Sequence, residues 1–157
     1  MHESQDLNTE FKKGDDPVTE ADFKCQYVIN SMLSTMAPGI FIVGEEGQNG
    51  LESKFDFDVS SLKCLGIPEF DNIEYPIEEL IVFVDPLDGT RSFTKGNMES
   101  VTTLITLVHK NEPIAAAIGD PYETRTQFRP TVYIGARGLN KVIQFESKGF
   151  YEHEQIK

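Results

Sequence analysis

The sequence predicts an α+β fold, because segments of helical and of strand character follow one another in a chain of 157 residues, the size of one domain. Three observations support this prediction. Apolar side chains between residues 19 and 36 recur at helical spacing, residues 81–84 form a short apolar run, and β-favouring segments over 101–108 and 113–118 flank a turn. Apolar residues make up 39% of the chain, which is enough to bury a core.

The first predicted element is an amphipathic helix that begins near Thr19 and ends before Pro38-Gly39. Thr19 and Asp22, three residues apart, resemble a capping pair. Asp22 therefore has two possible roles, as a helix cap or as an acid that faces a metal-bound water. The apolar positions follow the i, i+3, i+4, i+7 pattern of a helix at Cys25, Val28, Ile29, Met32, Leu33 and Met36.

A second short apolar run, residues 40–43, predicts a strand that ends in Gly44-Glu45-Glu46-Gly47. The paired glutamates are either a solvated turn or carboxylates placed at a site. Residues 47–79 are acidic and irregular and could not be assigned. Within them we note a strand-like alternation and a charge run that is most simply a solvated face, at Phe55, Phe57, Val59, Glu74, Glu78 and Glu79.

Residues 81–90, IVFVDPLDGT, are the most demanding stretch of the chain. The apolar run predicts a buried strand covered on both faces. Asp85 and Asp88 then bring two carboxylates onto one tight turn, which requires either a raised pKa or a cation. Hard oxygen ligands of this kind suit Mg²⁺ rather than Zn²⁺. The alternative is an ordinary Asp-Pro turn at the end of a strand.

A short helix is predicted over Thr90–Lys95 and is ended by Gly96. Its first N–H groups would face the same space as the two aspartates, which predicts a phosphate site beside a metal site. Further along, 110–112 is a predicted turn that makes 101–118 a hairpin, and 131–134 is one more strand. The tail, residues 148–157, is charged and shows no closing element.

The net charge of −12 disfavours nucleic acid and anionic membranes as partners. A phosphorylated substrate would also be repelled, so its binding would need a local cation. The chain has no apolar run long enough to span a membrane, and its polar N-terminus lacks the features of a signal peptide. Cys25 and Cys64 match no metal spacing. Together these features predict a cytoplasmic protein.

Three acidic motifs in the order DPVTEAD, GEE and DPLDGT resemble those of the lithium-sensitive, magnesium-dependent phosphomonoesterases, which include inositol monophosphatase and fructose bisphosphatase. Within that superfamily, VDPLDGTRSFTKGN with VTTLITLV and PIAAAIGDPY is most similar to the 3′(2′),5′-bisphosphate nucleotidases. The gap of 40 residues between Glu45 and Asp85 (85 − 45) fits these enzymes or the inositol polyphosphate 1-phosphatases. The latter tend to have serine at the position of Gly89, which favours the nucleotidases.

The resemblance implies a role for each matching residue. Glu45, Asp85, the Leu87 carbonyl and Asp88 would be ligands of Mg²⁺. Gly89 and Thr90 would offer backbone N–H groups to the phosphate, and Asp22 with Thr90 would orient and deprotonate the attacking water. The implied reaction is hydrolysis of 3′-phosphoadenosine 5′-phosphate to AMP and phosphate by in-line attack. An inositol phosphate is the alternative substrate.

The resemblance also implies a domain organisation, with helices layered against a mainly antiparallel sheet. Residues 1–15 would be a flexible N-terminus, 16–135 a sugar-phosphatase-like N-terminal domain, and 136–157 a divergent or frayed tail. The family's C-terminal half would be absent. A second hypothesis is therefore a catalytically incomplete protein that binds metal or a partner, or that self-associates through its truncated face. In a compact monomer, Val142–Phe150 would instead close the sheet.

Overall fold

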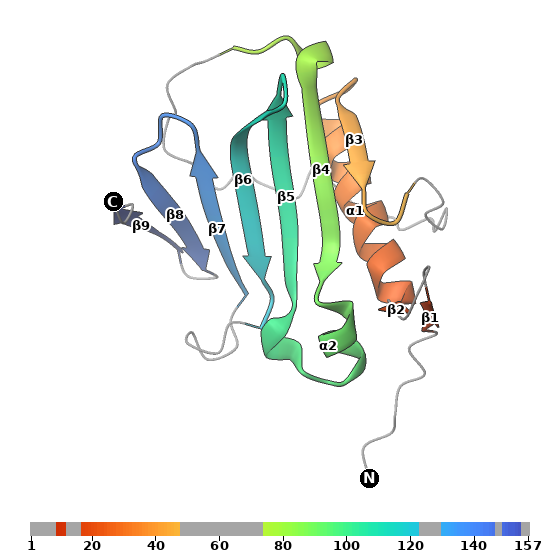
Figure 1. Cartoon of the computed structure of the whole chain (residues 1–157). Helices are drawn as coiled ribbons and strands as arrows, with labels where there is room; N and C mark the ends of the chain where they lie inside the picture. Colours follow the sequence, from red (N-terminus) through yellow and green to blue (C-terminus); the bar gives the residue numbers. More distant parts are fainter. Residues whose placement is uncertain (1–8, 12–16, 48–73, 123–129, 147–148, 155–157) are drawn as a thin grey trace.

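The computed structural model describes residues 9–11, 17–47, 74–122, 130–146 and 149–154 (Figure 1). Within them, seven strands form one sheet in the order β3-β4-β5-β6-β7-β8-β9. β3 and β4 are parallel, and every other neighbouring pair in this sheet is antiparallel. A small two-stranded sheet joins β1 to β2. The predicted α+β class with a mainly antiparallel sheet is confirmed.

The elements follow one another along the chain without a large insertion in the described parts. The strands are β1 (Glu10–Phe11), β2 (Pro17–Val18), β3 (Phe41–Gly44), β4 (Leu80–Asp88), β5 (Thr102–His109), β6 (Glu112–Asp120), β7 (Thr131–Ala136), β8 (Lys141–Glu146) and β9 (Gly149–Glu154). The helices are α1 (Glu20–Met36) and α2 (Thr90–Thr94), with 3-10 turns η2 (Ile77–Glu79) and η3 (Met98–Ser100). None of the described helices combines the length and apolar character that crossing a membrane requires.

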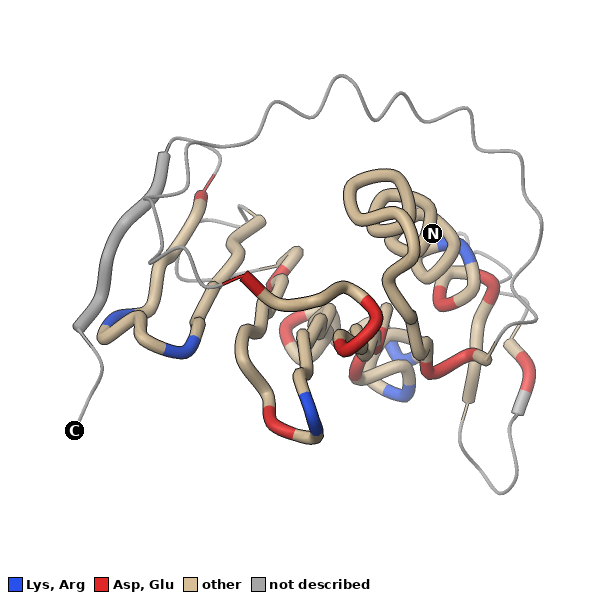
Figure 2. Tube along the Cα trace, turned by 90° about the horizontal axis from the view of Figure 1, so that it is seen from above, with Lys and Arg blue, Asp and Glu red and all other residues tan. Residues whose placement is uncertain are grey.

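Helix α1 begins where the capping pair predicts. The Thr19 side chain accepts a hydrogen bond from the Ala21 N–H, and the Asp22 side chain accepts one from the Thr19 N–H, which completes a capping box. Seen along the sheet, α1 lies against one face, at the end occupied by β3 and β4 (Figure 2). Its buried residues are Asp22 and Gln26, so the face that it turns inward is polar.

Strand β4 is buried on one face only, so the prediction of a strand covered on both faces was wrong. Val82 and Val84 are each 3% exposed, whereas Phe83 between them is 45% exposed. Side chains alternate between the two faces of a strand, and among the described helices only α1 packs against β4 to a large extent. Phe41 and Val43 of β3 are exposed on the same side as Phe83, because Val43 is the register partner of Phe83.

The predicted hairpin is confirmed as β5 and β6. Lys110 and Asn111 connect the strands with φ values of 47° and 67°. Two successive residues with positive φ give a turn whose twist matches that of antiparallel strands. The pairing has a register irregularity between Leu107 and Val108, directly before this turn.

The tail is more ordered than expected. Residues 141–146 form β8, which pairs with β7, and 149–154 form β9, which pairs with β8. Ile143 is completely buried and Phe145 is 7% exposed. The expectation of a frayed tail is therefore wrong for these residues. The physical reason is a short alternation of apolar and polar side chains from Lys141 to Glu146, which suits a strand with one buried face.

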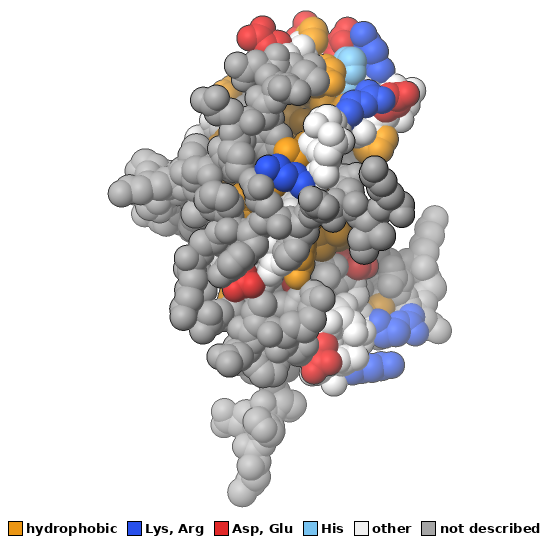
Figure 3. Space-filling view, turned by 90° about the vertical axis from the view of Figure 1, so that its left-hand side faces the viewer, with side chains coloured by type: hydrophobic (Ala, Val, Ile, Leu, Met, Phe, Trp, Pro, Cys, Tyr) orange, Lys and Arg blue, Asp and Glu red, His pale blue; other side chains and the backbone are white. Residues whose placement is uncertain are grey.

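Charged side chains gather at the end of the sheet where β4 begins (Figure 3). The Glu79 carboxylate of η2 lies 2.8 Å from His109 Nε2 and 3.0 Å from Lys110 Nζ at the end of β5. The hydrogen bond from His109, followed by that from Lys110, lowers the pKa of Glu79. Since the Tyr75 ring also stacks near His109, with centroids 4.5 Å apart, this cluster joins the start of β4 to the β5–β6 turn.

We predict that Ile143→Ala lowers the free energy of unfolding by about 2–5 kcal/mol, because it opens a cavity in the core. Ile118→Ala is the matched control, since Ile118 is 44% exposed, and should cost clearly less. Urea unfolding of both variants measures the difference. Equal losses would mean that β8 does not contribute to the core.

Candidate active site

A bulge in β4 places two aspartates on one face of the sheet. Asp85 pairs with Leu104 and Asp88 with Thr102, so the register shifts by one residue between them. In a regular strand, residues three apart point to opposite faces. Here both aspartates share the face of Leu104 and Thr102, because the bulge adds one residue to β4. The Thr103 hydroxyl donates to the Pro86 carbonyl at 2.9 Å and thereby satisfies part of the bulge.

The parallel pairing of β3 with β4 brings Glu45 beside Asp85. Gly44 is the register partner of Val84, and the Glu45 N–H donates to the Val84 carbonyl at 2.9 Å. The side chains of Glu45 and Asp85 are in hydrogen-bond contact. Two acidic motifs that lie 40 residues apart (85 − 45) are thus adjacent in space.

The carboxyl of Asp85 has a strongly perturbed pKa. Burial, the contact with Glu45 and the nearby charge of Asp88 raise it to about 7, although a hydrogen bond from the Leu87 N–H opposes the shift. That hydrogen bond, to Asp85 Oδ1, is 3.2 Å long. The group is therefore half protonated near neutral pH, which is the condition expected of carboxylates crowded without a cation.

The donor set here fits Mg²⁺. Among the described residues, no group of three or more His, Cys, Asp or Glu side chains is already arranged as a metal site. Mg²⁺ keeps several waters, however, and is usually bound through only one or two carboxylates. Glu45 and Asp85 provide such a pair, with oxygen as the only donor element. Asp88 is exposed, and one of its oxygens accepts a hydrogen bond from the Thr102 hydroxyl at 3.2 Å.

Asp22 reaches the site from α1 through Thr90. Asp22 is 1% exposed, and its Oδ2 accepts hydrogen bonds from the Thr19 N–H at 2.8 Å and the Thr19 hydroxyl at 2.6 Å. Its Oδ1 accepts from the Thr90 hydroxyl at 3.0 Å. The same hydroxyl lies 3.0 Å from the Leu87 carbonyl oxygen. Asp22 is therefore a helix cap, as predicted, and at the same time a partner of Thr90.

Gly89 forms the turn between the bulge and α2. Its φ of 89° is in the left-handed region, and a Cβ at this position would collide with the Ser100 carbonyl oxygen. Only glycine meets both conditions without a change of the backbone. α2 begins at Thr90 and has five residues, close to the predicted helix over Thr90–Lys95.

All the residues predicted for the site lie at the end of the sheet where α2 and the start of α1 meet β4. The roles predicted for them remain predictions. Sequence analysis missed Thr102 and Thr103, whose hydroxyls bind Asp88 and Pro86. Two adjacent threonines at the start of a strand gave no sign of this function, because their partners depend on the register of β5 against β4.

Comparisons with known proteins agree with this arrangement. The model of the inositol monophosphatase family matches residues 1–149. The 3′(2′),5′-bisphosphate nucleotidase 1 of Dictyostelium discoideum is 38% identical over 126 residues, which cover 78% of this chain and 40% of that protein. The chain thus spans well under half the length of this curated relative.

Solved structures show the same fold. The extragenic suppressor protein suhB from Bartonella henselae superposes with a TM-score of 0.60 at 22% identity, over 94% of this chain and 44% of that one. An IMPase/NADP phosphatase complexed with Mg²⁺ and phosphate superposes with a TM-score of 0.56 at 19% identity, over 90% of this chain and 42% of that one.

We predict that Gly89→Ala is more damaging than Gly96→Ala. Both glycines have positive φ, so each substitution should cost about 1–2 kcal/mol for the left-handed backbone. A side chain at Gly96 meets nothing within 4 Å, whereas one at Gly89 collides with the Ser100 carbonyl. Thermal unfolding compares the two variants, and equal losses would argue against a close contact between Gly89 and Ser100.

We also predict that the metal-free chain becomes less stable as the pH rises from about 4 to about 7. Across this range the folded chain holds a proton on Asp85 that the unfolded chain has already lost, because the folded pKa is about 7 and an ordinary aspartate has a pKa of about 3.9. Asp85→Asn should flatten this pH dependence, and Glu99→Gln, an exposed acid on η3, should not. Urea unfolding in EDTA at several pH values is the measurement. An unchanged slope in Asp85→Asn would contradict the raised pKa.

Proposed function

The chain belongs to the inositol monophosphatase family, whose enzymes are metal-dependent phosphatases, and from this we propose that it carries a Mg²⁺-dependent phosphomonoesterase site. The observation that carries the proposal is the crowding of Glu45 and Asp85, with Asp88 on the same face. Acidic groups held this close, with one pKa raised to about 7, have a use when a cation joins them. The family match also supports the reading of the three acidic motifs and extends it to residue 149.

Four groups would hold the ion, namely the side chains of Glu45, Asp85 and Asp88 and the Leu87 carbonyl. The Leu87 oxygen already accepts from Thr90, but a carbonyl oxygen has a second lone pair. When bound, Mg²⁺ supplies Lewis acidity for the attacking water and for the phosphate. Neutralising the carboxylates also removes the repulsion that the net charge of −12 would exert on a phosphorylated substrate.

Thr90 and Asp22 would move the proton of the attacking water. Both donors of Thr19 occupy Asp22 Oδ2, so Asp22 Oδ1 is left to receive the Thr90 hydroxyl hydrogen. This fixes the Thr90 oxygen as an acceptor toward the water, and the proton can pass through Thr90 to Asp22. Backbone N–H groups of Gly89 and Thr90 would bind the phosphate at the start of α2.

We propose 3′-phosphoadenosine 5′-phosphate as the substrate, with AMP and phosphate as products. The 38% identity to a protein named 3′(2′),5′-bisphosphate nucleotidase 1 supports this choice. The Gly89 turn supports it as well, because a serine, expected for the inositol polyphosphate 1-phosphatases, would collide with the Ser100 carbonyl. An inositol phosphate remains the alternative substrate, and the proposal includes neither nucleic acid nor membrane as a partner.

We predict that Thr90→Ala lowers the rate of phosphate release by about 100- to 10,000-fold, because it removes the acceptor for the water proton. Thr94→Ala is the control on the same helix, since the Thr94 hydroxyl only donates to the Arg91 carbonyl. Asp88→Asn and EDTA should also abolish most of the activity. Phosphate release is measured with 3′-phosphoadenosine 5′-phosphate and with inositol 1,4-bisphosphate.

Three outcomes would change the assignment. Full activity in EDTA or in Asp88→Asn would overturn the metal mechanism. A preference for inositol 1,4-bisphosphate would move the substrate to the alternative. Mg²⁺ binding without any hydrolysis would favour a metal-binding protein that is catalytically incomplete.

A further inference from the structure

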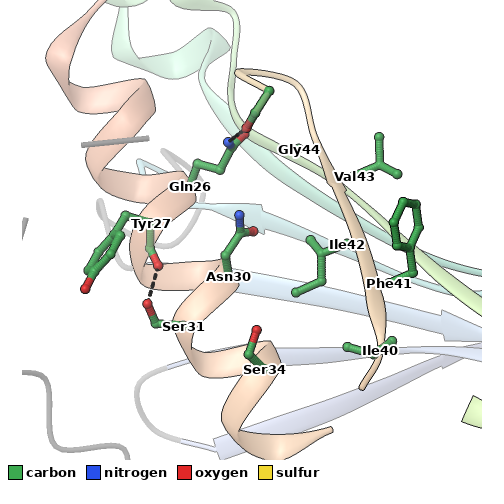
Figure 4. A pocket seen from close by; sticks show the side chains of 11 residues that line it. Gln26, Tyr27, Asn30, Ser31, Ser34, Ile40, Phe41, Ile42, Val43 and Gly44 are labelled. Carbon is green, nitrogen blue, oxygen red and sulfur yellow. Dashed lines mark hydrogen bonds between the residues drawn. The ribbon is translucent and has the colours of Figure 1, made fainter. Parts of the chain in front are cut away.

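Gln26 is a buried polar residue that the proposed chemistry does not use. It is 2% exposed and lies on α1, four residues after Asp22. Residues four apart share one face of a helix, so α1 presents both side chains in the same general direction. Asp22 points to Thr90 at the start of α2, whereas Gln26 points to the turn after β3 (Figure 4).

Both ends of the Gln26 amide bind the backbone of that turn. Its Nε2 donates to the Gly47 carbonyl at 2.7 Å, and its Oε1 accepts from the Glu46 N–H at 3.0 Å. An amide is required for this pair of contacts, because it offers a donor and an acceptor from one planar group. Gly44 makes room for the amide, since a Cβ at Gly44 would collide with the Gln26 side chain.

The turn that Gln26 holds carries Glu45. Residues 45 and 47 are exposed, so apolar packing does little to fix their position. The turn is tied to β4 by the hydrogen bond from the Glu45 N–H to the Val84 carbonyl, and to α1 by the two hydrogen bonds of Gln26 on the following residues. Without the second tie, the backbone after Glu45 could rotate and withdraw its carboxyl from Asp85.

We propose that Gln26 is a positioning residue for the Glu45 carboxylate. By reading the backbone of residues 46 and 47, it holds Glu45 against Asp85 and so preorganises the pair for a divalent cation. Because Asp22 lies on the same helix, one rigid element sets both the cation ligand and the proton acceptor. This inference rests on the proposed function, since it assumes that Glu45 and Asp85 bind a metal.

The test is the affinity for Mg²⁺ alone, measured by isothermal titration calorimetry without substrate. Gln26→Met keeps the length of the side chain but removes both hydrogen bonds, and Gln26→Asn keeps the amide but withdraws it from the turn. Each should weaken Mg²⁺ binding by about 10- to 100-fold, the range typical of residues that support metal ligands. Ser31→Ala is the control, because the Ser31 hydroxyl donates to the Tyr27 carbonyl within α1 and should leave the affinity unchanged.

A double-mutant cycle separates positioning from general stability. In a Glu45→Gln background, Gln26→Met should change the Mg²⁺ affinity by less than threefold, because the carboxylate that it positions is gone. Equal weakening in both backgrounds, or an unchanged affinity with a lower melting temperature, would overturn the proposal. No Mg²⁺ binding by the wild-type chain would instead overturn the proposed function, and this inference with it.

Discussion

The contact between Glu45 and Asp85 is the constraint on which the site depends. Two acidic side chains repel each other when ionised, so an isolated chain would keep them apart. Here the parallel ladder of β3 and β4 forces them together, and the β4 bulge turns Asp88 to the same face. The pKa of Asp85, raised to about 7, measures how strongly the fold opposes solvation of these charges. A bound cation would relieve this strain.

The acidic site and the exposed apolar surface lie on the same face of the sheet. Phe83 and Asp85 are two residues apart on β4, and Val43 and Glu45 are related in the same way along β3 and the turn that follows it. α1 packs on the opposite face and reaches the site only around the end of the sheet, through Asp22 and Thr90. A substrate would therefore approach from the open face, while the proton acceptor is held from behind.

Much of the fold was predictable, because its signals are local. The capping pair placed the start of α1, and alternation and turn residues placed β3, β5, β6 and β7 within one or two residues. Two predictions failed for reasons that are not local. Phe83 is exposed because no described helix covers its face, and residues 141–146 are ordered because β7 offers an edge for pairing.

The sequence by itself determined which residues could do the chemistry, since three acidic motifs in a particular order indicate metal-dependent phosphate hydrolysis. It also determined the elements that carry them. Only the tertiary structure decided how these groups meet. The register of β4 against β5 set the common face of Asp85 and Asp88, and the position of α1 gave Gln26 its partners at residues 46 and 47. Register and packing depend on residues far apart in the chain, and local propensity and periodicity carry no information about which distant groups will pair.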